Sequence, residues 1–166
     1  MREHGLYEKS FRTEKSYKAA PDSRAQAAVD GYSEHSESAA EGHQLTGSRD
    51  RALLAAQAAA SKKAQDVLIL DVAELIGITD YFVICSGSNE RQVATVVDEV
   101  EKRLRDRGVK PYRREGEREH RWVLLDYVDI VVHVFHTQER EFYELERLWK
   151  DAGRVEFEDE AAAAGG

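Results

Sequence analysis

The sequence predicts one α/β domain in which helices flank a mixed β-sheet. Two observations lead to this prediction. Short runs of β-branched and aromatic residues, each the length of a strand, recur between residues 67 and 136. Segments that are rich in alanine or that carry a helical stripe lie before, between and after these runs. The expected order is α-β-β-α-β-β-β-α, over residues 48–151.

The first part of this domain is predicted to be a helix followed by two strands. Residues 49–64 (RDRALLAAQAAASKKA) are rich in alanine, the strongest helix former. Residues 67–72 (VLILDV) and 81–86 (YFVICS) have the length and composition of strands. Gly77 interrupts the segment between them.

A second helix is predicted over residues 89–107. Its apolar stripe consists of Val93, Val96, Val97, Val100 and Leu104. Asn89 is suited to cap its N-terminus, with Gln92 three residues on, as in a variant of the capping box. Gly108 marks its end.

The last part is predicted to be three extended segments and a helix. Pro111 begins a short extended piece, and residues 121–126 and 129–136 form two strands. Residues 139–151 form a closing helix. The stripe of this helix consists of Phe142, Leu145, Leu148 and Trp149.

Composition separates this domain from the two ends of the chain. Residues 1–47 are polar, with scattered apolar residues and no period, so we expect a disordered extension. Residues 152–166 (AGRVEFEDEAAAAGG) are expected to be a flexible acidic tail.

The charge and the cysteine content narrow the class of protein. The net charge is -8, which favours a basic partner over generic attraction to nucleic acid. The single cysteine excludes an intramolecular disulfide framework and suits a reducing compartment. No apolar run has the length of a membrane span, and the N-terminus lacks the apolar core of a secretory signal. We therefore expect a cytoplasmic protein.

The segment LLDYVDIVVHVFH (124–136) is the strongest candidate for a site. A hairpin with Tyr127 and Val128 at its turn would bring Asp126 opposite Asp129 and Trp122 opposite His133. One face would then carry Trp122, Leu124, Asp126, Asp129, Val131, His133 and Phe135. The core face would carry Val123, Leu125, Ile130, Val132 and Val134.

Three interpretations of the first face stay open on the residues alone. Two neighbouring carboxylates need a positive group near them, which a metal ion, an internal Arg or Lys, or a basic partner can supply. The face is therefore a metal or catalytic site, an ordinary charged surface, or an apolar and acidic recognition surface. Tyr-Val is poor chemistry for a two-residue turn, and a longer loop would shift the pairs.

A second candidate is the Ser86-Gly87-Ser88 turn that leads into the helix at Asn89. Small residues before a helix N-terminus can bind an anion, as they do in nucleotidyltransferases. The paired aspartates that such an enzyme needs do not follow it, so a tight turn with a helix cap is the simpler interpretation. In residues 113–121 the charges nearly cancel, which indicates a solvated loop.

Five motifs follow one another along the predicted domain: ITDYFVICSGS (78–88), RQV (91–93), REG (114–116), WVLLDYVDIVVH (122–133) and FYELERLW (142–149). In order and spacing they resemble the ribosomal silencing factor RsfS family, also called the iojap-like family. The resemblance runs from about residue 49 to residue 151. It implies an α/β fold related to nucleotidyltransferases and no established catalytic activity.

The resemblance also implies a function. Members bind the large ribosomal subunit through large-subunit ribosomal protein fourteen and sterically block the small subunit, which lowers translation when nutrients are scarce. Organellar members act in large-subunit assembly, which is the alternative role, and a metal-dependent nucleotidyltransferase is the rival enzyme hypothesis. We expect no cofactor or metal, and the oligomeric state stays open, a homodimer included. The residues expected to bind the partner are Trp122, Leu124, Asp126, Asp129, His133 and Tyr143.

Overall fold

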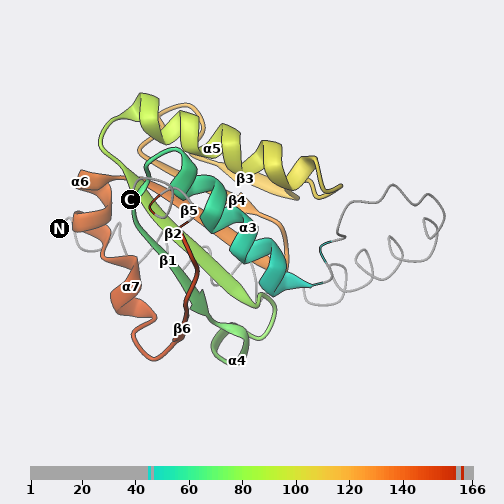
Figure 1. The fold of residues 1–166 in the computed structure, drawn as a ribbon. Helices are drawn as coiled ribbons and strands as arrows, with labels where there is room; N and C mark the ends of the chain where they lie inside the picture. Colours follow the sequence, from blue (N-terminus) through green and yellow to red (C-terminus); the bar gives the residue numbers. More distant parts are fainter. Residues whose placement is uncertain (1–44, 46, 160–161, 163–166) are drawn as a thin grey trace. The chain divides into compact units, whose positions relative to one another are not determined.

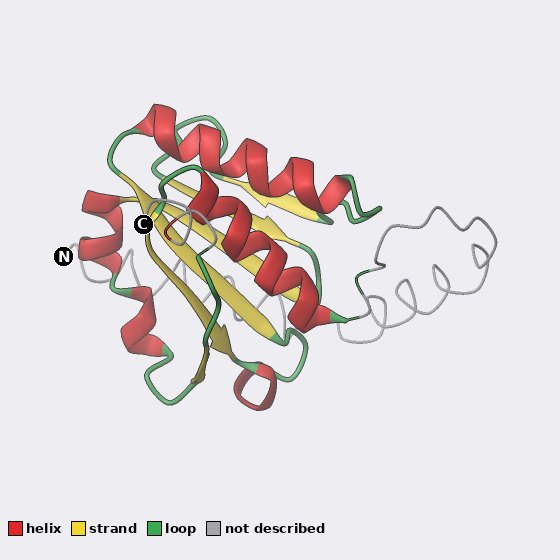
Figure 2. Cartoon of the chain, viewed as in Figure 1, coloured by secondary structure: helices red, strands yellow, loops and turns green. Residues whose placement is uncertain are grey.

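The computed structural model describes residues 45, 47–159 and 162. Elements carry the labels of Figure 1, and Figure 2 separates helices from strands by colour. The helices are α3 (Ser48–Ser61), α4 (Ala73–Ile76), α5 (Glu90–Arg105), α6 (Thr137–Tyr143) and α7 (Leu145–Leu148). The strands are β1 (Gln65–Asp71), β2 (Tyr81–Gly87), β3 (Arg113–Glu115), β4 (Trp122–Asp126), β5 (Ile130–His136) and β6 (Gly153–Val155).

The strands form one mixed sheet in the order β3-β4-β5-β2-β1-β6. The central pair, β2 and β5, is parallel, and every other neighbouring pair is antiparallel. The predicted α/β domain with a mixed sheet is thus confirmed. Within the described residues, no helix has both the length and the apolar character needed to cross a membrane.

Helices α3 and α5 cover one face of the sheet, which we call the aliphatic face (Figure 1). Six alanines of α3 are buried there, and their small side chains let the helix lie close to the strands. Beneath the helices lie Ile69, Val83, Cys85, Val123, Leu125, Ile130, Val132 and Val134. The five predicted core residues of the hairpin are all among them.

The opposite face, which we call the aromatic face, is built from rings. Trp122 stacks on Phe135 with ring centroids 4.7 Å apart. The segment from α6 to the end of α7 adds Tyr143, whose ring lies 4.9 Å from that of Trp122. Trp149, the residue directly after α7, makes an edge-to-face contact with Phe82 at a centroid distance of 5.5 Å. Such offset and edge-to-face contacts add to the stabilisation from buried area.

The closing helix differs from the prediction because the backbone turns in its middle. Glu144 has a left-handed conformation, φ 42° and ψ 50°, which ends α6 and starts α7 in a new direction. As a result only Leu145 of the predicted stripe is fully buried, whereas Phe142 and Leu148 remain exposed. A single straight helix would have placed all of them on one side.

The structure also contains two short elements that the sequence pattern did not indicate. Helix α4 is a single turn that ends at Gly77, whose φ of +83° favours glycine. Strand β6 lies in the segment expected to be a flexible tail, where it pairs with β1 and forms the edge strand on that side of the sheet. Phe157 beyond it is partly buried against the core. The expected N-terminal extension lies outside the described residues, apart from Leu45 and Gly47.

Candidate functional site

The β4–β5 hairpin has a different register from the predicted one. Asp126 pairs with Val131, Leu124 with His133 and Trp122 with Phe135, so the predicted pairs were wrong by two residues. Because side chains alternate along a strand, a shift of two leaves each strand residue on its predicted face.

The turn itself explains the shift. Asp129 N–H donates to Tyr127 O at 3.0 Å, and Tyr127 N–H donates to Ile130 O at 2.9 Å. The first bond closes a γ-turn centred on Val128, whose φ of +75° is rare for a β-branched residue, and the second joins the two strands across the turn. Asp129 consequently belongs to the turn and not to the face that carries Asp126.

Each aspartate of the expected acidic pair has its own arginine. The Asp126 side chain is fully buried; Arg113 Nη2 lies 3.7 Å from its Oδ2, and Val128 N–H donates to its Oδ1 at 2.9 Å. Asp129 Oδ2 accepts a hydrogen bond from Arg51 Nη1 of α3 at 2.7 Å. Burial raises the pKa of Asp129, and the charge of Arg51 opposes that rise. Internal arginines therefore supply the positive charge that the residue pattern required.

His133 is a core residue. Trp122 Nε1–H donates to His133 Nδ1 at 3.2 Å, and the ring of Phe82 meets the imidazole with centroids 4.9 Å apart. Complete burial lowers the pKa of His133 from 6.5 to about 3, so the ring is neutral at neutral pH. Its Nε2 has no hydrogen-bond partner among the described residues. Nor do these residues contain a group of three or more His, Cys, Asp or Glu suited to a metal ion.

Four of the six expected partner-binding residues expose almost no surface. Relative exposure is 6% for Trp122, 3% for Leu124, 0% for Asp126 and 1% for His133. Asp129 and Tyr143 are half-buried. The expectation of an open face was therefore wrong, because α6 and α7 fold back over the aromatic face. Whether any of the six residues contributes to partner binding stays a prediction.

The exposed side of α6 and α7, which cover the aromatic face, carries apolar and acidic side chains. Phe142 is 44% exposed and Leu148 is 39% exposed. Glu141 and Glu144 are exposed beside them in the sequence. We call these four residues, together with Tyr143, the α6–α7 patch. The break at Glu144 creates it, and a break of this kind in a non-glycine residue has no clear signature in the sequence.

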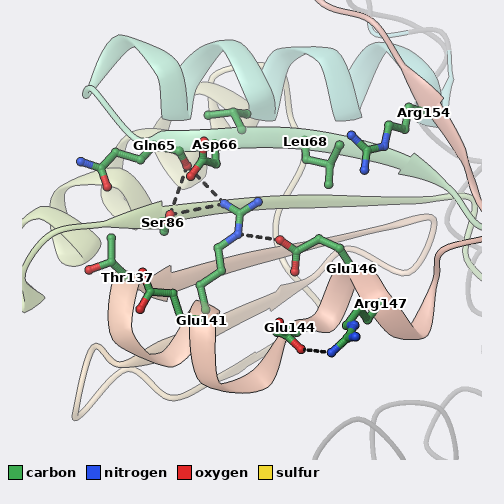
Figure 3. Close-up of a pocket in the computed structure, with 12 residues that line it drawn as sticks. Gln65, Asp66, Leu68, Ser86, Thr137, Glu141, Glu144, Glu146, Arg147 and Arg154 are labelled. Carbon is green, nitrogen blue, oxygen red and sulfur yellow. Dashed lines mark hydrogen bonds and ion pairs between the residues drawn. The ribbon is translucent and has the colours of Figure 1, made fainter.

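Arg140 holds α6 and α7 against the sheet. Its Nη1 lies 3.3 Å from both Gln65 O and Ser86 Oγ, and its Nε donates to Glu146 Oε1 of α7 at 2.9 Å. These bonds run from α6 to the first residue of β1, to the last part of β2 and to α7, and Figure 3 labels the three partners Gln65, Ser86 and Glu146. The bonds border a cavity of about 680 Å³ lined by side chains of both charges. Residue pattern alone did not single out Arg140, because its partners are distant in the sequence.

The Ser86-Gly87-Ser88 turn is a structural cap. Ser88 N–H donates to Gln92 Oε1 at 2.8 Å, and Gln92 N–H donates to Asn89 Oδ1 at 2.8 Å, so the predicted cap is confirmed. A Cβ on Gly87 would lie 3.1 Å from Val93 N, so glycine allows the close approach of α5. The amides of Ser88 and Gln92 are thus used by the chain itself.

The aspartates and the Gly-Ser turn lie at opposite ends of the sheet. In the parallel β2–β5 pair, Tyr81 lies beside Ile130, whereas Gly87 lies beside His136. Asp129 is next to the first end, where its carbonyl accepts from Asp80 N–H at 2.8 Å. Six residues of strand separate the two ends by about 20 Å. A nucleotidyltransferase site that needs these groups together does not form.

Comparison with known proteins identifies the family. A family described as "Ribosomal silencing factor during starvation" matches residues 46–165. The chain belongs to this family, RsfS. It is 45% identical over 105 residues to the ribosomal silencing factor RsfS of Halalkalibacterium halodurans, covering 63% of this chain and 90% of the relative.

One solved structure and one mitochondrial relative extend the comparison. A crystal structure of a protein from Chromobacterium violaceum matches with a TM-score of 0.62 at 30% identity, covering 63% of this chain and 88% of the other. A mouse protein named mitochondrial assembly of ribosomal large subunit protein 1 is 33% identical over 91 residues. That match covers 53% of this chain and 40% of the mouse protein.

Proposed function

We propose that this protein is a cytoplasmic silencing factor that binds the large ribosomal subunit through large-subunit ribosomal protein fourteen. Bound there, it sterically blocks the small subunit and lowers translation when nutrients are limiting. The observation that supports this most is the match of residues 46–165 to a family described by silencing during starvation. The mechanism needs no chemical step, only sufficient affinity and occupancy.

The α6–α7 patch is the surface that we propose for docking. Its exposed apolar side chains, Phe142 and Leu148, offer area that a partner can remove from water. The exposed carboxylate of Glu141 complements a basic surface and favours oriented association, whereas the carboxylate of Glu144 is paired with Arg147 at 2.7 Å. Tyr143, half-buried at this patch, would touch the partner directly.

The other expected binding residues take a supporting role in this proposal. The ring of Trp122 packs against the ring of Tyr143, and His133 accepts the hydrogen bond that the indole N–H of Trp122 donates. Leu124 and Asp126 lie deeper on the same face of β4. Asp129 lies at the far end of β5, so we place it outside the contact.

Sedimentation with isolated large subunits tests the proposal. The full-length protein is expected to move with the subunits and to reduce their joining with small subunits. Phe142→Glu is expected to weaken binding about tenfold or more, because it places a charge in the apolar centre of the contact. Leu75→Glu is the matched control, since Leu75 is 47% exposed on α4, and it is expected to bind like the wild type.

Two results would count against this proposal. A wild-type protein that stays at the top of the gradient would exclude stable binding to the subunit. Equal losses in Phe142→Glu and Leu75→Glu would exclude the α6–α7 patch as the docking surface.

A role in large-subunit assembly is the second candidate. It is supported by the mouse relative, whose name refers to assembly of the mitochondrial large subunit. Depletion of the protein separates the two roles. Accumulation of incomplete large subunits, with normal joining of mature subunits, would favour assembly over silencing.

A further inference from the structure

A basic segment lies at the end of α5 in this acidic protein. Residues 102–114 contain seven Arg and Lys residues and one acidic residue, whereas the whole chain has a net charge of -8. The segment comprises the last turn of α5, the loop after it and the start of β3. In Figure 1 this end of α5 points away from α6 and α7. The domain therefore separates its basic end from the acidic α6–α7 patch.

Several of these basic residues are already paired within the fold. Arg114 Nε lies 2.6 Å from Glu101 Oε1, and Arg103 Nε lies 2.7 Å from Glu99 Oε1. Arg105 and Lys110 differ from them, since both are exposed and neither forms an ion pair within residues 47–159. Their charges thus remain available to a partner.

An exposed aromatic residue, Tyr112, lies in the sequence between Lys110 and the start of β3. Tyr112 is 63% exposed, more than any other large apolar or aromatic side chain that is exposed in the described part of the chain. Its backbone is held in place, because Tyr112 N–H donates to Asp126 O of β4 at 2.7 Å. Tyr112, Arg105 and Lys110 border one shallow hollow of about 580 Å³. A ring on a fixed backbone loses little conformational freedom when it makes a contact.

We propose that this surface binds single-stranded RNA without sequence preference. Arg105 and Lys110 contact backbone phosphates, and Tyr112 stacks on one base. Cations that follow the backbone beside an exposed aromatic ring are the combination that single-stranded nucleic acid requires. None of these contacts reads a base edge, so no sequence selection results. On the large subunit the ligand is an exposed strand of ribosomal RNA, a detail that rests on the proposed function.

The test measures fluorescence anisotropy of a labelled, mixed-sequence RNA of roughly 12 nucleotides with the full-length protein. Wild-type binding is expected to weaken steeply between about 50 and 200 mM salt. Arg105→Glu/Lys110→Glu is expected to lower affinity about tenfold or more and to reduce the salt slope by about 2. Tyr112→Leu is expected to lower affinity about fivefold with little change in slope.

The matched control is Arg91→Glu/Lys150→Glu, which makes the same charge change at exposed residues outside the hollow. It is expected to stay within about twofold of the wild type, since local contacts dominate at moderate salt. Circular dichroism confirms that each variant is folded.

Three outcomes would overturn the inference: no RNA binding by the wild type, equal losses in the control, or equal competition by an acidic peptide of matched charge. The last outcome would assign the surface to an acidic protein. Any of these outcomes can occur while the wild type still sediments normally with large subunits. In that case only RNA binding is rejected, and the silencing proposal stands.

Discussion

The two faces of the sheet are buried by different means. The aliphatic face is covered by alanine and valine side chains of α3 and α5, and its stability comes from removing apolar area from water. The aromatic face buries His133 and Asp126, which require specific partners such as Trp122 and Arg113. The first face is thus sensitive to polarity and volume. The second is sensitive to pH and to the loss of single partners.

The largest effect is expected from a charge on the aliphatic face. Val132 is fully buried in the core cluster between the sheet and its helices. Val132→Asp would bury a carboxylate with no cation beside it, a cost of about 4 kcal/mol or more that is comparable with the whole stability of a small domain. Loss of the far-ultraviolet circular dichroism signal at 25 °C is the expected result.

Val132→Thr is the control for this substitution. It keeps the branched shape and buries only a hydroxyl, so we expect a folded protein that is destabilised by about 1 to 2 kcal/mol. A folded Val132→Asp protein with a normal melting curve would show that the helices of the aliphatic face can open to solvent.

On the aromatic face the next largest effect is a dependence of stability on pH. The pKa of His133 is about 3 in the folded protein and 6.5 as its ordinary value. The unfolded chain therefore binds a proton below pH 6.5 that the folded chain does not bind until near pH 3. Above pH 6.5, His133 does not reduce the free energy of unfolding. As the pH falls from 6.5 towards 3, the free energy of unfolding decreases by about 1.4 kcal/mol for each pH unit.

Urea unfolding at pH 7 and pH 5 measures this contribution. We expect the wild type to lose about 2 kcal/mol more than His133→Gln over this interval. Glutamine is close in size, can accept the Trp122 hydrogen bond and does not titrate. Protonation of carboxylates changes the free energy of unfolding equally in both proteins, so this change cancels in the difference. Identical losses in the two proteins would mean that His133 is not desolvated in the fold.

Local patterns in the sequence were sufficient to predict which residues form the aliphatic face. The stripe from Val93 to Leu104 became α5, and alternation along β5 placed Val132 and Val134 in the core, because both features depend on periodicity within one element. The register of the β4–β5 hairpin could not be predicted from such periodicity. It depends on a positive φ at Val128, which the chemistry of valine disfavours.

The burial of the candidate site could not be predicted for a related reason. Trp122 and His133 become inaccessible only because α6 and α7 turn at Glu144 and fold back. That arrangement is held by Arg140, which reaches Gln65, 75 residues away in the sequence. No local pattern specifies a contact over such a separation. An assignment of exposed and buried faces from alternation therefore failed where a distant element covered the sheet.

The Arg51–Asp129 pair joins α3 to the hairpin turn and offers a smaller test of the aliphatic side. The two side chains are 23% and 27% exposed, and their charged atoms lie 2.7 Å apart. Asp129→Lys would replace this attraction with repulsion, and we expect a loss of about 1.5 kcal/mol in urea unfolding. The charge swap Arg51→Asp/Asp129→Lys is expected to recover at least half of that loss. No recovery would mean that Asp129 acts through the turn alone and not through Arg51.

The smallest effect is expected where α5 begins. Asn89 accepts a hydrogen bond from Gln92 N–H, and Gln92 Nε2 in turn donates to Lys63 O at 2.9 Å, just after α3. Asn89→Ala leaves the Gln92 amide without its cap and is expected to cost about 1 kcal/mol, or about 5 °C in Tm. Asn89→Ser can still cap the helix and is expected to stay near the wild type. If Asn89→Ala and Asn89→Ser both melt at the wild-type temperature, the Asn89 cap adds no stability, and the start of α5 is held by the Gln92 side chain and by packing on the aliphatic face.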